Sequence, residues 1–155
     1  MATEKQFQFF QSLYLEETDR AKSLRDRGNS YLSLVTLYSA FVIFVAEKMR
    51  PTDNFERVLF SLTMGAMVTA FVVSLWANRI ASFQIAIEPR DIITELGKSP
   101  PTDAEFFDDR ILDYVLACEQ NSKINDGKAE WLSIAGYCLL LAIALHACYF
   151  LFATI

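Results

Sequence analysis

Three long runs of apolar residues, separated by charged segments, dominate the pattern of this 155-residue chain. The last run, 131–155, contains no charged residue. As a helix rising ~1.5 Å per residue it would be about 37 Å long, enough to cross the ~30 Å hydrocarbon layer of a bilayer with some tilt. Shorter runs of the same kind lie at 30–46 and 58–77. The pattern therefore predicts an all-α, three-span helical transmembrane protein that forms one domain, 1–155.

The remaining segments are polar and divide the chain between the spans. Residues 1–29 form an expected amphipathic helix because apolar side chains recur at steps of three and four, with Glu17 interrupting the stripe: Phe7, Phe10, Tyr14, Ala21 and Leu24. Residues 47–57 form a short polar turn, which makes the first two spans an antiparallel hairpin.

The segment 78–130 is expected to be helical and to lie outside the bilayer. It contains short predicted helices at 78–87 and 90–96, then a proline linker at 99–101. Thr102-Asp103-Ala104-Glu105 resembles a capping box, which begins a long helix leading into the third span. We call 1–29 and 103–130 the two polar arms, and we expect them to pack together through their apolar stripes.

Basic residues set the expected orientation. The first 30 residues contain five Lys or Arg, 78–130 contains six and the 47–57 turn contains three, and no basic residue follows Lys128. Because Lys and Arg collect on the cytoplasmic side, we expect the N-terminus and 78–130 in the cytoplasm, and the turn and Ile155 on the other side.

Composition argues against several classes of function. The net charge of −5 and pI near 4.9 disfavour binding of duplex nucleic acid through a basic surface. No P-loop, dinucleotide-binding glycine pattern, nucleophile elbow or HExxH motif occurs. The cysteines lack metal-site spacing, and Cys118 is more simply a core residue of an arm. We expect no enzyme activity, no catalytic residue, no metal and no cofactor.

The second span contains two ladders of small residues at four-residue spacing. One is Ser61, Gly65 and Thr69, and the other is Ala66, Ala70 and Ser74. Small residues allow helix backbones to approach closely in lipid. The ladders are explained either by packing within one protomer or by packing between protomers, including packing around a pore.

His146 is the only histidine and lies in the middle of the third span. A polar side chain at that depth is costly unless it faces protein or water. We expect it either to form a hydrogen bond between helices or to line or gate a pore. A metal-ligand role has no second ligand in the sequence to support it.

The polar arms contain two further sets of candidate residues. Basic and amide side chains that could bind a small anionic ligand are Arg20, Arg25, Arg27, Asn121, Asn125 and Lys128. The basic residues could equally anchor the helix to anionic headgroups, and the asparagines could bond to the neighbouring arm. Glu105, Asp109 and Asp113 share one helical face and could form an acidic vestibule near a pore, or simply a solvated surface.

The layout of an amphipathic helical arm, a tight two-span hairpin and a further helical segment resembles the SLATT family of small bacterial antiphage membrane effectors. The stretch Asn125-Asp126-Gly127-Lys128-Ala129 is also similar to the entry motif of Pycsar transmembrane effectors, although here it precedes the last span instead of the first. The resemblance implies a homo-oligomer in the bacterial inner membrane. It also implies a nucleotide or oligonucleotide ligand made by a partner nucleotidyltransferase.

The expected function is therefore that of a membrane effector in antiphage defence. On a nucleotide-type signal it would oligomerise, form or gate a pore and disrupt the inner membrane. Two alternatives remain open at this point: a non-conducting membrane scaffold that recruits a cytosolic partner, and a holin-like pore that kills without a signal.

Overall fold

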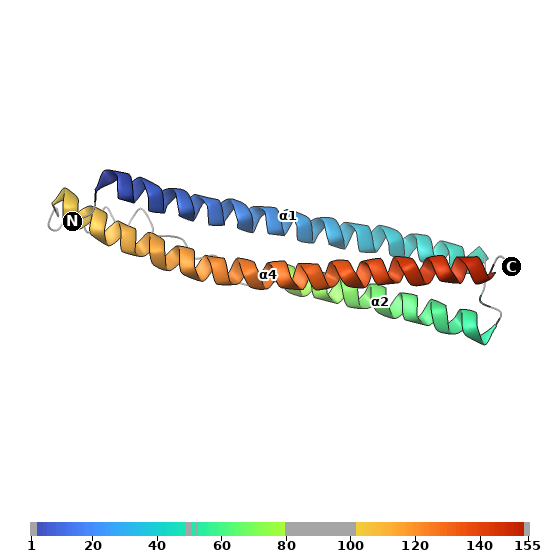
Figure 1. The fold of residues 1–155 in the computed structure, drawn as a ribbon. Coiled ribbons are helices and arrows are strands. Elements are labelled where there is room, and N and C mark those ends of the chain that lie inside the picture. The colour runs from blue at the N-terminus through green and yellow to red at the C-terminus, as the bar shows by residue number, and fades with distance from the viewer. Residues whose placement is uncertain (1–2, 49–50, 52, 80–101, 154–155) are drawn as a thin grey trace. The chain divides into compact units, whose positions relative to one another are not determined.

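The computed structural model describes residues 3–48, 51, 53–79 and 102–153. These residues form three α-helices and no strand: α1 (Glu4–Lys48), α2 (Asn54–Arg79) and α4 (Asp103–Ala153) (Figure 1). The expected all-helical fold is confirmed for this part of the chain. The rest of the predicted 78–87 helix, the 90–96 helix and the 99–101 linker lie outside the described residues.

The helix ends follow local capping chemistry. At the start of α4, the Thr102 hydroxyl lies 3.4 Å from the Glu105 backbone N–H, and the Glu105 carboxylate accepts from the Thr102 N–H at 3.0 Å. This is the reciprocal pattern of a capping box, as predicted. At the start of α2, the Asp53 N–H similarly donates to the Glu56 carboxylate at 3.4 Å. Because α1 continues to Lys48 and α2 already begins at Asn54, the predicted 47–57 turn was too long.

The chain separates into two compact units, and α1 and α4 contribute to both. In the first unit, residues 4–23 of α1 pack against residues 103–126 of α4. Phe7 lies 5.5 Å from Phe107, and Tyr14 lies 5.4 Å from Tyr114, measured between ring centroids. Residue numbers rise together along the contact, so the two segments are parallel. The expected contact between the two polar arms is therefore observed for these segments, whereas their location outside the bilayer stays a prediction.

The second unit contains residues 24–48 of α1, all of α2 and residues 127–153 of α4. Ala77 of α2 packs with Leu24 and Leu132, whereas Met67 packs with Val42 and Ala142, so α2 runs antiparallel to the other two helices. Buried positions recur at steps of three and four, which is the spacing of coiled-coil seams: Leu59, Thr63, Met67, Ala70, Ser74 and Ala77 in α2, and Leu132, Ala135, Leu139, Ala142, His146 and Tyr149 in α4.

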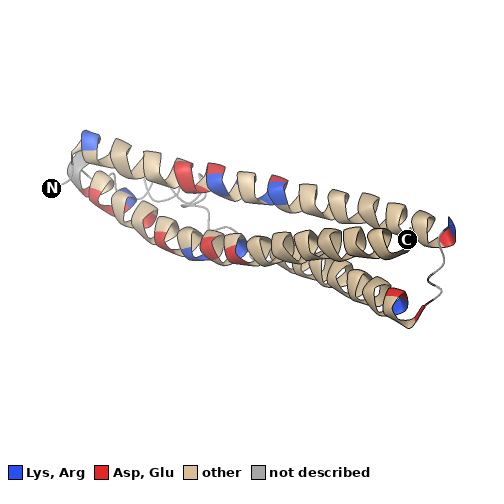
Figure 2. Ribbon diagram, turned by 45° about the vertical axis from the view of Figure 1, so that its right-hand side comes forward, with Lys and Arg blue, Asp and Glu red and all other residues tan. Residues whose placement is uncertain are grey.

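The outer surface of the second unit is largely apolar. Leu37 is 72% exposed, Leu140 is 63% exposed and Leu151 is 67% exposed. Figure 2 shows long uncharged stretches in the C-terminal parts of α1 and α4 and through most of α2. Each of the three helices is long and apolar enough to cross a membrane. A surface of this composition suits hydrocarbon, and the chain has the properties of a multi-pass membrane protein.

Candidate functional site

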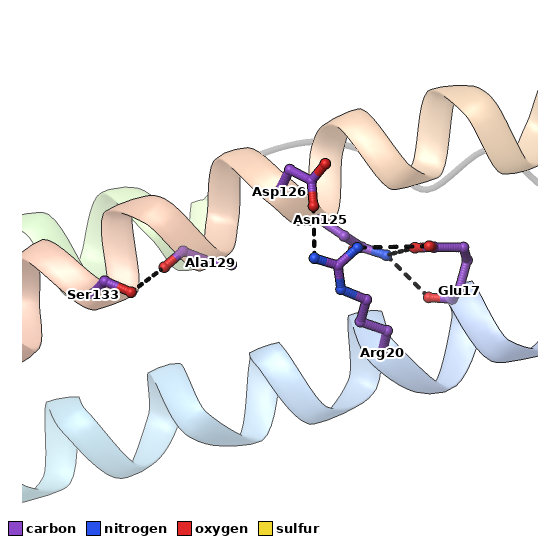
Figure 3. A network of polar contacts seen from close by, with 6 residues as sticks. All are labelled: Glu17, Arg20, Asn125, Asp126, Ala129 and Ser133. Carbon is purple, nitrogen blue, oxygen red and sulfur yellow. Dashed lines mark hydrogen bonds and ion pairs between the residues drawn. The ribbon is translucent and has the colours of Figure 1, made fainter.

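A group of four polar residues joins α1 to α4 in the first unit (Figure 3). Asn125 is fully buried, and its side-chain N–H group donates to the Glu17 carboxylate at 2.8 Å and to the Glu17 carbonyl at 3.0 Å. Arg20 donates to Asp126 at 2.6 Å and lies 3.6 Å from the Glu17 carboxylate. The stripe of the amphipathic helix is therefore interrupted at Glu17 because that residue has a polar partner in the facing helix.

Charge in this group is balanced within the protein. The hydrogen bond to Asp126 raises the pKa of Arg20, and the Asp126 and Glu17 charges act in the same direction. The Arg20 and Asp126 side chains are 40% and 66% exposed, so water screens the pair and it contributes at most about 1 kcal/mol to stability. An anionic ligand at Arg20 has to compete with two carboxylates that are already in place.

The six residues considered for ligand binding divide between the two units. Arg20, Asn121 and Asn125 belong to the first, and Arg25, Arg27 and Lys128 belong to the second. Asn121 is fully buried and already has an interaction partner. The pKa of Lys128 is lowered, mainly by burial and further by the charge of Arg25. Two cations therefore lie close enough in the second unit to repel each other.

The three acids of the predicted vestibule have separate local roles. Glu105 caps the N-terminus of α4, and its hydrogen bonds to Thr102 lower the pKa of its carboxyl group. Asp113 lies 3.4 Å from Arg110, whereas Asp109 is exposed. Because α4 is a regular helix here, the three residues share a face as expected. Their role near a pore stays a prediction.

A hollow of about 350 Å³ lies beside Cys118 in the first unit. Glu16, Glu17 and Glu119 line it together with apolar and hydroxyl side chains. Burial raises the pKa of the Cys118 thiol, and the Glu17 charge adds to the effect, which disfavours the reactive thiolate. Among the described residues, no group of three or more His, Cys, Asp or Glu side chains is arranged to hold a metal ion.

His146 forms the hydrogen bond between helices that was one of its two expected roles. Its Nδ1 lies 2.7 Å from the Tyr38 hydroxyl of α1, and the histidine is only 3% exposed. Aromatic rings surround it, with centroids 5.6 to 6.1 Å from the imidazole: Tyr38, Phe41, Tyr149 and Phe150. Nε2 is buried without a hydrogen-bond partner in the described part of the chain.

The two small-residue ladders of α2 have opposite environments. Ala70 and Ser74 are fully buried in the seam and Ala66 is partly buried, so this ladder packs within the protomer. Ser61, Gly65 and Thr69 are all exposed, and a Cβ added at Gly65 would meet no atom within 4 Å. Packing within one protomer therefore explains only the ladder of Ala66, Ala70 and Ser74. The ladder of Ser61, Gly65 and Thr69 remains available for contact with another protomer.

Sequence reasoning included bonds from Asn125 to the facing arm and from His146 to another helix among its alternatives, but it did not identify their partners, Glu17 and Tyr38. The break in the stripe at Glu17 was a signal for the first pair, because a charged residue in an apolar interface needs a polar neighbour.

Comparisons of the chain with protein-family models, curated proteins and solved structures find no match. The similarity to SLATT effectors therefore depends on helix layout alone.

Proposed function

We propose that this chain is a homo-oligomeric membrane effector whose spans associate through the exposed ladder of α2 and form or gate a pore. In this proposal the polar arms lie in the cytoplasm, the C-terminus lies outside, and a nucleotide-type signal controls the oligomer. The resemblance to bacterial antiphage effectors supports the signal and the inner-membrane location. The distribution of Lys and Arg supports the orientation.

The exposed ladder is the observation that carries the proposal. Ser61, Gly65 and Thr69 lie on the face of α2 opposite its buried seam, because the seam residues Thr63, Met67 and Ala70 are half a turn away. The Thr69 hydroxyl bonds back to the Gly65 carbonyl at 2.8 Å, so it adds no unpaired polar group to the surface. A small, smooth face of this kind favours close contact with another helix in lipid.

The polar arms are the proposed sensor. In the first unit, Arg20 and Asn125 contact carboxylates of the protein, and an anionic ligand would bind by replacing these contacts with its own. Arg25 and Lys128 place two mutually repelling positive charges in the second unit. Both sets have the donors that phosphate oxygens require.

Membrane depolarisation tests the pore. The full chain is expressed in bacteria with a potential-sensitive dye, with and without a neighbouring nucleotidyltransferase gene if one is present. We expect depolarisation on activation, and we expect Gly65→Leu to abolish it while the chain still inserts. Ala144→Leu is the matched control, because it adds similar bulk at an exposed position of α4.

The outcomes separate the candidate functions. Depolarisation by the chain alone indicates a holin-like pore, and capture of a cytosolic partner with intact potential indicates a scaffold. Either result contradicts the proposed signal-controlled effector. Full activity of Gly65→Leu contradicts the role of the exposed ladder.

A further inference from the structure

A groove of about 460 Å³ lies between α1 and α4 in the second unit, and α2 contributes nothing to its lining. Its size falls within the ~300–1,000 Å³ range of small-molecule sites. On α1 the lining runs from Arg27 through Tyr31 to Leu34, and on α4 it runs from Ser133 to Ile143. The α4 part alone spans about 15 Å at ~1.5 Å per residue.

The groove changes from charged to apolar along its length. Arg27 is the last charged residue of α1 before the uncharged run 28–46, so it lies where the span begins. Leu34, Leu140 and Ile143 line the deeper part. The ~15 Å length matches one leaflet of a hydrocarbon layer about 30 Å thick. A groove with a charge at one end and an apolar lining as long as one leaflet matches the charged headgroup and the acyl chain of a phospholipid.

The charged end is prepared for a phosphate. The Arg27 guanidinium lies 5.8 Å above the Tyr31 ring centroid, and such cation–π contact holds it in place. In contrast with Arg20, Arg27 has no ion pair with a described residue. A guanidinium can bind phosphate oxygens through two parallel hydrogen bonds.

Gly136 shapes the middle of the groove. A Cβ at this position would lie 3.0 Å from the Tyr31 hydroxyl, so the glycine lets the tyrosine reach across to α4. That hydroxyl has no hydrogen-bond partner in the described part of the chain and can donate to an ester carbonyl. Ser133 is already occupied, because its hydroxyl donates to the Ala129 carbonyl at 2.8 Å.

We propose that this groove binds one anionic phospholipid, with its phosphate at Arg27, an ester carbonyl at Tyr31 and an acyl chain along Leu34, Leu140 and Ile143. Anionic lipid is favoured over zwitterionic lipid because the latter brings its own ammonium group, which competes with Arg27. The proposal needs membrane insertion but not pore formation. It is therefore separable from the proposed function.

Native mass spectrometry of the detergent-solubilised full chain tests the site. Phosphatidylglycerol is titrated in, and phosphatidylcholine and inorganic phosphate are the comparison probes. We expect one phosphatidylglycerol per protomer, bound at least tenfold more tightly than phosphatidylcholine. Arg27→Gln should weaken phosphatidylglycerol binding by at least about tenfold, because it removes the charge-assisted hydrogen bonds from the guanidinium to the phosphate.

Two further variants keep the result specific. Lys22→Gln is the matched control, because Lys22 is an exposed cation on the same helix and does not line the groove. Leu140→Trp should lower binding of both lipids by filling the channel, with helix content unchanged by circular dichroism. Equal binding of the two lipids, unchanged binding by Arg27→Gln, or displacement of the lipid by inorganic phosphate would overturn the proposal.

Discussion

The hydrogen bond between Tyr38 and His146 offers the sharpest test of how the second unit is held together. Tyr38→Phe removes one hydroxyl and leaves the ring contacts at 5.6 Å in place. Hydrogen bonds between helices in membrane proteins contribute ~0.6 kcal/mol on average and ~1.7 kcal/mol at most. Among the described residues, Nε2 of this buried histidine already has no partner, so Tyr38→Phe leaves both ring nitrogens unpaired and the cost should lie near the upper end of that range. We therefore expect Tyr38→Phe to destabilise the protein by about 1–2 kcal/mol.

A double-mutant cycle isolates the pair. Tyr38→Phe, His146→Phe and the double variant are unfolded in mixed micelles of increasing dodecyl sulfate content, with helix content followed by circular dichroism. We expect a coupling energy of ~0.6–1.7 kcal/mol, above the ~0.3–0.5 kcal/mol scatter of independent sites. Tyr137→Phe is the control, because Tyr137 is 71% exposed and should tolerate the change. Additive effects of the two substitutions would refute the argument that this bond stabilises the fold.

The same variants address the second expected role of His146. If the side chain only joins two helices, His146→Phe should leave any conductance in proteoliposomes unchanged as long as the variant remains folded. If His146 lines a pore, conductance or its pH dependence should change even in a variant of full stability. The stability measurement and the conductance measurement thus separate structure from gating.

Three further substitutions test other contacts. Gly28→Leu should destabilise the protein by about 1–3 kcal/mol in the same unfolding assay, because a Cβ there collides with the Asn78 side chain, whereas Gly65→Leu should have little effect on the protomer. Asp126→Asn should cost less than about 1 kcal/mol, and the difference should shrink at high salt, because its partner Arg20 is exposed. Lys128 has a folded-state pKa below its ordinary value of 10.5, so stability should rise as pH increases from that lowered pKa to about 10.5. Lys128→Met should lack this rise and should be more stable than the unaltered protein at pH 7. Unfolding at pH 7 and at pH ~10.5 measures both effects.

The elements that depend on local sequence were predictable. Uncharged runs located the three helices, and the Thr102-to-Glu105 spacing located the start of α4. The corresponding hydrogen bond from Asp53 to Glu56 was not predicted, because proline and polar neighbours are typical of a turn throughout 47–57. Local rules of this kind need no knowledge of which helices meet.

Partners between helices were not predictable from one sequence. The register of two parallel helices decides that Asn125 meets Glu17, and no local pattern encodes that register. The same limit applied to the ladders of α2: their spacing is identical, yet Ala70 is buried and Gly65 faces open space. Only the positions of α1 and α4 distinguish the two faces.

The seam of the second unit indicates where its stability comes from. Burial of large apolar side chains contributes little in lipid, because hydrocarbon solvates leucine as well as a protein interior does. Accordingly, Leu37, Leu140 and Leu151 are exposed, and the seam mixes small residues and hydroxyls such as Ala142 and Thr63 with its larger apolar side chains. Close backbone contact at the small residues, and the hydrogen bond between Tyr38 and His146, then supply the binding energy between helices. A second face with the same small residues, at Gly65, has the means to form the same kind of contact with another protomer.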